Sequence, residues 1–205
     1  MKNESQTTPP LPCAPATDPG TKLLDAARDI FVREGIKGLS VRRIAESAGV
    51  TTMAVYSRFN GKDGLLTALF DEGFSMLSQA QQAVDPALKE EARLLAFCRA
   101  YRATAHAHPH HYALMLGHFS GELEPSPDSQ AKAMATLDCL IDAVTMMAVM
   151  KGEKRAVSTE IANRLFAFCH GWVSLERMGF LGEGLSVNRA FDKAVLALTV
   201  INSKN

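Results

Sequence analysis

Between positions 40 and 62, this chain carries serine and threonine hydroxyls, arginine and lysine cations, and two long side chains, Met53 and Tyr56. Hydroxyls and cations bind phosphate oxygens, and side chains near a helix N-terminus can reach base edges in the major groove of DNA. The chemistry that this set offers is therefore recognition of a nucleic acid rather than bond-making. The candidate DNA-binding residues are Ser40, Arg42, Arg43, Thr51, Thr52, Met53, Tyr56 and Lys62.

Two short helices joined by a tight turn are expected to position these side chains. Ser40 is a preferred N-cap residue, so a helix is predicted to begin there. The spacing of its apolar residues gives it one inward face, made of Val41, Ile44, Ala45 and Ala48. Gly49 is expected to end this helix, because glycine adopts the left-handed conformation common just past a helix C-terminus. A second helix is predicted to begin at Thr51 or Thr52. This pattern is typical of a helix-turn-helix, whose second helix enters the major groove.

The stretch from about Thr21 to Phe74 resembles the N-terminal domain of the TetR/AcrR family of transcriptional regulators. The shared features are Ala26, Ala27 and Phe31, the turn from Gly35 to Gly38, the segment from Ile44 to Val50, and Val55, Tyr56, Phe59, Lys62, Leu65 and Leu66. Two positions depart from the family pattern. Met53 stands where many relatives carry glycine or proline, and Gly64 replaces a residue that is usually acidic or otherwise polar.

The resemblance implies a role for each matched position. Ser40 and Arg42 would contact the DNA backbone or bases from the start of the second helix. The reading surface of the third helix would consist of Thr52, Met53 and Tyr56. Lys62 would meet a phosphate at the start of the fourth helix, where the helix dipole also favours an anion. The alternative is an ordinary solvated face formed by Arg42, Arg43, Arg58 and Lys62.

Length and charge are consistent with a small DNA-binding domain and a larger second domain. The chain has 205 residues and a formal net charge of zero. Residues 18 to 65 hold eight basic against six acidic side chains, whereas the part after residue 65 holds thirteen against fifteen. So small an excess of basic side chains argues against a protein that coats nucleic acid nonspecifically. The predicted organisation is a disordered tail (1–17), a helix-turn-helix domain (18–66) and a helical ligand-binding and dimerisation domain (67–205).

The first twenty residues carry no sign of export. They lack an apolar run after Lys2, and the four prolines between positions 9 and 15 favour an extended or disordered tail. We therefore expect a cytoplasmic protein with no membrane partner. No pair of cysteines has metal-type spacing, and reduced thiols are expected because Cys98, Cys139 and Cys169 lie within apolar helical stretches. The cysteines are Cys13, Cys98, Cys139 and Cys169.

The rest of the chain is predicted to be helical. Proline and glycine breaks separate apolar stretches, and no segment shows the alternation of a strand, so the fold class is all-α with about nine helices. The segment from Asn163 to Phe180 resembles a helix of one branch of the same family, in which an aromatic residue, here Phe166, precedes a His-Gly pair. In the family, the last two long helices form a dimeric four-helix bundle. The residues expected at that interface are Phe168, Trp172, Leu175, Phe191, Val195 and Leu198.

The resemblance also implies that the remaining helices enclose a small-molecule site. Methionine and aromatic side chains make an adaptable apolar pocket, although ordinary core packing is the alternative for each of them. The sequence does not identify the ligand. The candidate lining residues are Phe97, Tyr101, Met115, Met134, Met146, Met150 and His170.

Closely spaced histidines raise the alternative of a metal sensor, since imidazoles bind zinc, copper and nickel. They are His106, His108, His110, His111 and His118. Because Pro109 interrupts the helix among them and no acidic residue follows until Glu122, we assign neither a metal site nor a cofactor. An enzyme is not expected either, since no nucleophile elbow, phosphate-binding glycine loop or paired-carboxylate motif is present.

These observations predict a DNA-binding transcriptional regulator. In its most specific form, the prediction is a homodimeric repressor that binds a palindromic double-stranded operator and is released by a small-molecule effector. One alternative is an all-α protein-interaction module that does not bind DNA. Another is a metal-responsive regulator that uses the histidines from His106 to His118.

Overall fold

The computed structural model describes residues 18–116, 123–150, 155–182 and 184–200, so the predicted tail and Cys13 lie outside it. The described residues form nine α-helices and one short 3₁₀ helix and contain no strand, which confirms the all-α prediction. None of these helices is long and apolar enough to cross a membrane. The elements are α1 (Pro19–Glu34), η1 (Ile36–Gly38), α2 (Val41–Ala48), α3 (Thr52–Phe59), α4 (Lys62–Gln82), α5 (Glu90–Ala107), α6 (Pro109–Leu116), α7 (Pro127–Met150), α8 (Arg155–Arg177) and α9 (Leu185–Ala197).

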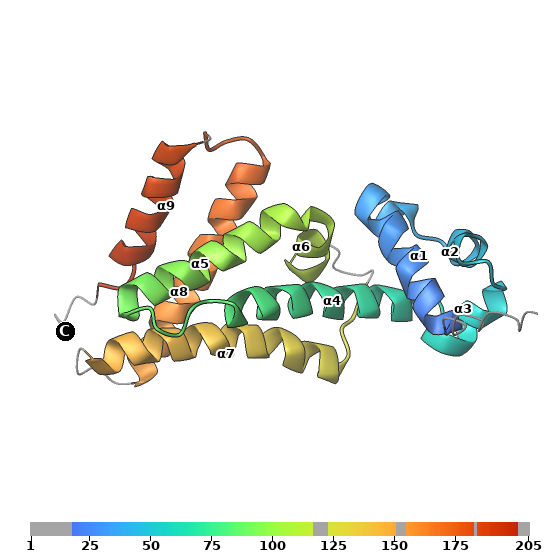
Figure 1. Ribbon diagram of the computed structural model, residues 1–205, viewed down its shortest axis with the longest axis horizontal. Coiled ribbons are helices and arrows are strands. Elements are labelled where there is room, and N and C mark those ends of the chain that lie inside the picture. The colour runs from blue at the N-terminus through green and yellow to red at the C-terminus, as the bar shows by residue number, and fades with distance from the viewer. Residues whose placement is uncertain (1–17, 117–122, 151–154, 183, 201–205) are drawn as a thin grey trace, which may run out of the picture.

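Helices α1, α2 and α3 form a unit at one end of the molecule (Figure 1). The carboxylate of Asp18 caps α1 by accepting a hydrogen bond from the Gly20 N–H at 2.9 Å, and Pro19 occupies the first turn, where its missing N–H costs nothing. The apolar faces of the three helices meet the first turns of α4 in one core. Its fully buried side chains include Leu23, Ala27, Ile30, Phe31, Ile44, Ala45, Val55, Leu65, Leu66 and Leu69.

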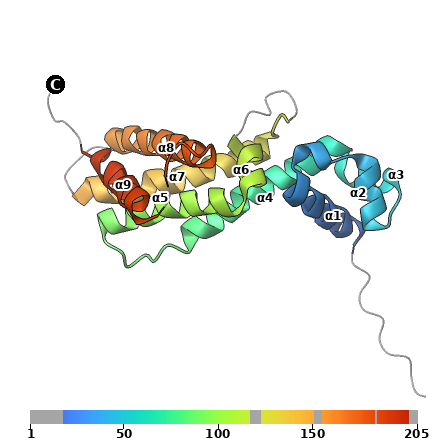
Figure 2. The same ribbon diagram turned by 90° about the horizontal axis from the view of Figure 1, so that it is seen from above.

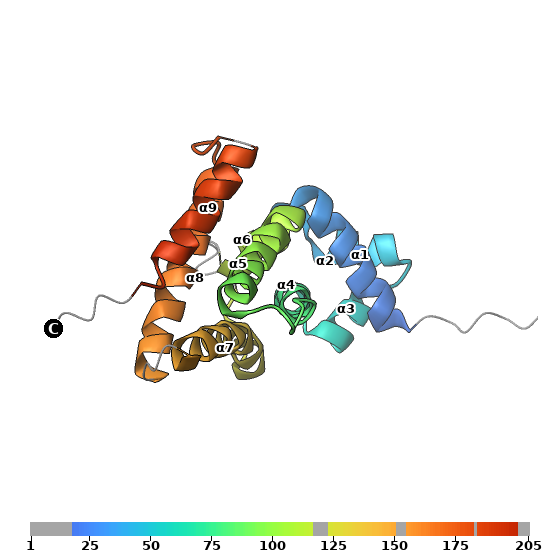
Figure 3. The ribbon, with the colours of Figure 1, turned by 60° about the vertical axis from the view of Figure 1, so that its left-hand side comes forward.

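Helix α4 continues from this unit into the second one, along the length of the molecule (Figure 1). Leu65 and Leu66, near its start, belong to the first core, whereas Leu77 belongs to the second. In a view nearly along α4, helices α1 and α3 lie on one side of it and α5 and α7 on the other (Figure 3). The predicted domain boundary after residue 66 therefore falls inside a continuous helix, with no linker between the two units.

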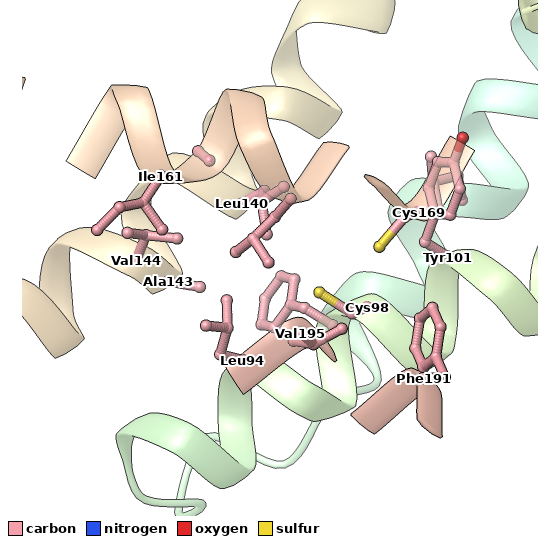
Figure 4. Packing of buried hydrophobic residues seen from close by; sticks show 14 of the residues in the cluster. Leu94, Cys98, Tyr101, Leu140, Ala143, Val144, Ile161, Cys169, Phe191 and Val195 are labelled. Atoms are coloured by element: carbon pink, nitrogen blue, oxygen red, sulfur yellow. The ribbon is translucent and has the colours of Figure 1, made fainter. Parts of the chain in front are cut away.

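The second core lies among α5, α7, α8 and α9 and the end of α4. Figure 4 shows Leu94, Leu140 and Val195 converging in it from α5, α7 and α9. Full burial of one such side chain contributes about 1.5 to 3 kcal/mol, so this cluster is a major source of stability. Its fully buried members include Leu94, Val144, Met147, Ile161, Ala162, Leu165, Val173, Phe191 and Val195.

Helix α6 is short and lies between the two units (Figure 2). Pro109 is its first residue, so the predicted break between His108 and Pro109 is confirmed. Its residue Tyr112 belongs to the second core and Leu114 to the first, while Met115 packs against both. A displacement of α6 would therefore change the packing of both cores at once.

Candidate nucleic-acid interface and apolar cavity

The turn between α2 and α3 has the geometry that the sequence predicts. Ser40 Oγ accepts a hydrogen bond from the Arg43 N–H at 3.3 Å and so caps α2. Gly49 ends the helix at φ 66° and ψ 34°, a left-handed conformation that glycine adopts without steric cost. The next residue, Val50, donates its N–H to the carbonyl of Ala45 at 3.0 Å and packs against the first core. These contacts fix the angle at which α3 leaves α2.

Helix α3 turns one face to solvent. Val55 is fully buried beneath it, whereas Met53 is 72% exposed and Tyr56 is 57% exposed. Thr51 and Thr52, at the N-terminal end, are exposed as well. The predicted reading surface is therefore one continuous exposed face, whose N-terminal end is formed by small hydroxyl side chains.

Two of the nearby cations are engaged by carboxylates of α1 and its cap. Both terminal nitrogens of Arg43 donate to the carboxylate of Glu34 at 2.5 Å, and this pair ties α2 to the end of α1. These hydrogen bonds lower the pKa of Glu34. Arg58, at the end of α3, lies 3.2 Å from the carboxylate of Asp18. Arg43, which the sequence predicts as a DNA contact, thus already has a bidentate partner within the domain.

Two other cations are better placed for a phosphate. Arg42 is 85% exposed along its side chain, and among the described residues it pairs only with Glu46, one turn further along α2, at 2.9 Å. Lys62 is the first residue of α4, where unpaired backbone N–H groups and the helix dipole favour an anion. Within the described part of the chain, Lys62 makes no ion pair.

The junction of α3 and α4 explains Gly64. A Cβ atom at this position would lie 1.6 Å from the carbonyl oxygen of Phe59, so any side chain would require the two helices to separate. Gly61, which precedes α4, has φ 96°, and a Cβ there would lie 3.3 Å from the ring of Tyr56. The departure from the family pattern at Gly64 therefore accompanies a close approach of α4 to the recognition helix.

The described histidines that raised a metal hypothesis make contacts with different helices. His106 hydrogen-bonds a glutamate of α8 at 2.8 Å, whereas the rings of His110 and His111 pack against Phe31 of α1, with centroids 5.9 and 5.0 Å apart. His118 lies outside the described residues. Within the part of the chain that the structure describes, no group of three His, Cys, Asp or Glu side chains is arranged to hold a metal.

His111 lies in a buried contact between α6 and the unit formed by α1, α2 and α3. Its side chain is 2% exposed, and its Nε2 lies 3.6 Å from a carboxylate oxygen of Glu72 on α4. The other oxygen of Glu72 accepts a hydrogen bond from Arg28 of α1 at 2.5 Å. Burial lowers the pKa of His111, and the neighbouring Glu72 offsets only part of this effect. Burial thus favours the neutral imidazole where α1, α4 and α6 meet.

A mainly apolar cavity of about 240 Å³ lies where the two cores meet and is lined by side chains of both. Of the predicted lining residues, Phe97, Tyr101, Met115 and Met134 line it. Met146 does not, because it is 53% exposed and contacts Arg93, and His170 lies behind the wall. The side chain of Met150 lies outside the described set. Lining residues that the sequence did not indicate are Phe70, Phe74, Leu77, Gln81, Cys98, Leu116, Ala133, Thr136, Leu137, Leu140, Phe166 and Cys169.

Hydrogen bonds order the few polar groups of the wall. Gln81 is 6% exposed and donates from Nε2 to the carbonyl of Thr136 at 3.1 Å. Tyr101 donates its hydroxyl to that of Tyr112 at 3.3 Å, and Tyr112 in turn lies 2.7 Å from Nδ1 of His170. His170 is therefore a support for the wall and not part of it.

Two cysteine thiols complete the wall. Cys98 and Cys169 come from α5 and α8, and Figure 4 shows their sulfur atoms on neighbouring parts of the core. A hydrogen bond with Cys169 together with burial raises the pKa of Cys98 well above its usual value, so the thiol stays protonated. Both are free thiols, as the sequence predicts.

The residues predicted for a dimer interface divide into two groups. Phe191 and Val195 are fully buried within the monomer, which corrects their assignment to an interface. Phe191 stacks on Phe168 with centroids 5.7 Å apart and meets the edge of Trp172 at the same distance, so these rings join α9 to α8. Leu198 packs against the same core. The apolar side chains that remain at the surface here are Leu175, Met178, Phe180 and Leu185.

An N-terminal helix-turn-helix with an exposed recognition helix, followed by a helical unit around an apolar cavity, defines a class of two-domain DNA-binding regulators. Two family models match this chain. Residues 23–69 match the bacterial regulatory proteins of the tetR family, and residues 94–198 match the tetracyclin repressor-like C-terminal domain. The chain therefore belongs to the TetR family, as its resemblance implied.

Known relatives share part of the chain at the sequence level. The HTH-type transcriptional regulator SrpR of Pseudomonas putida is 41% identical over 56 residues, which is 27% of this chain and 26% of SrpR. The HTH-type transcriptional regulator Rv1816 of Mycobacterium tuberculosis is 31% identical over 99 residues, 47% of this chain and 42% of that protein. The chain thus spans less than half the length of the curated relatives it matches.

Similarity in structure extends over nearly the whole chain. A protein of unknown function from Rhodococcus sp. RHA1 has a TM-score of 0.73 and 28% identity, covering 90% of this chain and 95% of that one. This agreement extends the shared fold from the helix-turn-helix unit to the helices that surround the cavity.

Proposed function

We propose that this chain binds double-stranded operator DNA and regulates transcription. The observation that carries the proposal is the exposed face of α3, where Thr52, Met53 and Tyr56 project from a recognition helix fixed by the turn at Gly49. Lys62 adds a cation at a helix N-terminus beside it. The protein would act through binding and not through catalysis.

We further propose that the operator is palindromic and is bound by a homodimer. Each recognition helix then meets one half-site, and adjacent major-groove faces require a separation of roughly 34 to 36 Å. Leu175 on α8 and Met178, the residue just after it, expose apolar surface, and Gly171 has open space beyond its Cα. A second copy of α8 packed along this line would bury that surface. The proposed interface therefore excludes Phe191 and Val195 and centres on Gly171, Leu175 and Met178.

The regulator would be a repressor released by a small molecule in the cavity. Met115 of α6 lines the cavity, while His110 and His111 of the same helix contact α1 of the DNA-binding unit. A ligand can weaken DNA binding only if it prefers the conformation that does not bind DNA, with a typical coupling of about 1 to 3 kcal/mol. By reciprocity, operator DNA would weaken ligand binding by the same factor.

A binding assay with the DNA beside the chain's own gene tests the proposal. Replacing Tyr56 and Lys62 together with alanine should abolish specific binding, since Tyr56 lies on the exposed face of α3, Lys62 begins α4 beside it, and neither belongs to the core. Lys193→Ala is the matched control, because it removes an exposed lysine on α9, outside the helix-turn-helix. Unchanged affinity of the double variant at a fixed salt concentration would favour a protein-interaction module instead.

A further inference from the structure

The described side chains that line the cavity include several aromatic rings but no charged group. Aromatic side chains reach it from α4, α5 and α8, namely Phe70, Phe74, Phe97, Tyr101 and Phe166. Among the described residues, no Asp, Glu, Lys, Arg or His side chain lines it. A ligand with a net charge would therefore lose its hydration without gaining a counter-charge, which is costly. A neutral molecule with a flat apolar body suits such walls best.

The hydroxyl groups of the wall already donate to acceptors within the chain. Thr136 donates its hydroxyl to the carbonyl of Ala133 at 2.7 Å, and Tyr101 donates to Tyr112 at 3.3 Å. Gln81 donates from Nε2 to the Thr136 carbonyl, and this bond orients the amide, because a flipped amide would place two carbonyl oxygens together. The Oε1 of Gln81 is buried and has no partner in the described chain. What the wall lacks is a donor directed to this oxygen.

The volume limits the size of the occupant. About 240 Å³ corresponds to roughly eight water molecules at about 30 Å³ each, and it lies just below the usual range of pockets for drug-sized ligands. A fused two-ring molecule is of this scale. We propose that the cavity binds a neutral bicyclic aromatic molecule whose single N–H or O–H group donates a hydrogen bond to Gln81.

This inference rests on the proposed function, since it assigns a chemical class to the effector, but its test needs no DNA. Calorimetric titration of the full-length chain would compare two pairs of probes of equal size: indole with benzofuran, and 1-naphthol with 1-fluoronaphthalene. In each pair only the first member has a donor. We expect the donor to improve affinity about fivefold to tenfold, because it pairs a buried acceptor that is otherwise unsatisfied.

A variant separates a bond to Gln81 from a general preference for the donor probes. Gln81→Met keeps a long side chain but removes the acceptor, so it should bind both members of each pair equally. Gln82→Met makes the same change at the exposed neighbour and should keep the wild-type preference. Thermal unfolding checks that both variants fold, and the comparison of probes in the wild-type chain does not depend on either variant.

The outcomes are distinct. A donor preference that disappears only in Gln81→Met supports the assignment. Equal affinity within both pairs, or no binding of any probe to the wild-type chain, overturns it. If indole binds with this preference but leaves operator affinity unchanged, the ligand class stands and the proposed release from DNA fails.

Discussion

Arg43 and Lys62 carry the same charge but differ in their surroundings, so their removal should have different effects. Lys62→Ala should weaken binding to all DNA sequences alike and reduce the salt dependence of the affinity by about one counterion, as expected for a phosphate contact. Arg43→Ala should instead slightly lower the free energy of unfolding, because it breaks a surface pair with Glu34. Affinity measured over a salt series and urea unfolding distinguish the two. The reverse assignment of effects would contradict the proposed roles.

At the scale of single residues, the sequence predicts which side chains are exposed better than it predicts which residues they contact. The face of α3 follows from helical spacing, so Tyr56 and Val55 fall on opposite sides as expected. The partner of Arg43 is nine positions away on another helix, and nothing local indicates it. The sequence did not indicate Gln81 for a similar reason. A glutamine beside Gln82 near a helix end is usually solvated, and it is the packing of α7 that buries this one.

At the scale of elements, α6 gives a prediction about pH. Burial lowers the pKa of His111, so the unfolded chain takes up a proton at a higher pH than the folded chain does. The free energy of unfolding should therefore decrease as pH falls below about 6.5, the ordinary value for histidine. His111→Gln should show a smaller decrease in urea unfolding between about pH 7 and 5.

An exposed histidine provides the control for this experiment. His106 lies on α5 and contacts a glutamate of α8, so His106→Gln removes a histidine without touching α6. Its decrease in stability with falling pH should be at least as large as that of the wild type. If His111→Gln and the wild type lose the same stability, burial of His111 is not the source of the pH dependence.

For the last helix, the sequence predicts which face is buried but not which segment covers it. The apolar spacing of Phe191 and Val195 correctly predicts one buried face of α9, but the same spacing serves a partner subunit or the chain's own core. Packing against α8 places both residues inside the monomer, and three aromatic rings join the two helices. The number and type of helices follow from local sequence, whereas the partner of each face depends on contacts between distant segments.

For the molecule as a whole, the proposed dimer can be tested without disturbing the core. A Cβ atom at Gly171 would meet no atom of another segment of the monomer within 4 Å, so Gly171→Leu is expected to fold. The same side chain would keep a second α8 from approaching, and the dimer should dissociate at concentrations where the wild type stays dimeric. Light scattering measures the mass, and Gln79→Leu, an exposed position on α4, is the control. A dimeric Gly171→Leu variant would contradict an interface centred on α8.

Selection from a random duplex library tests the central claim, that an exposed recognition helix in a symmetric pair reads DNA. The wild-type chain should enrich an inverted repeat whose half-site centres lie about one helical turn apart, roughly 34 to 36 Å. The variant with Tyr56 and Lys62 replaced by alanine should enrich nothing under the same salt conditions. A wild-type selection that yields no sequence motif would contradict DNA recognition, and a motif without inverted symmetry would contradict the paired arrangement.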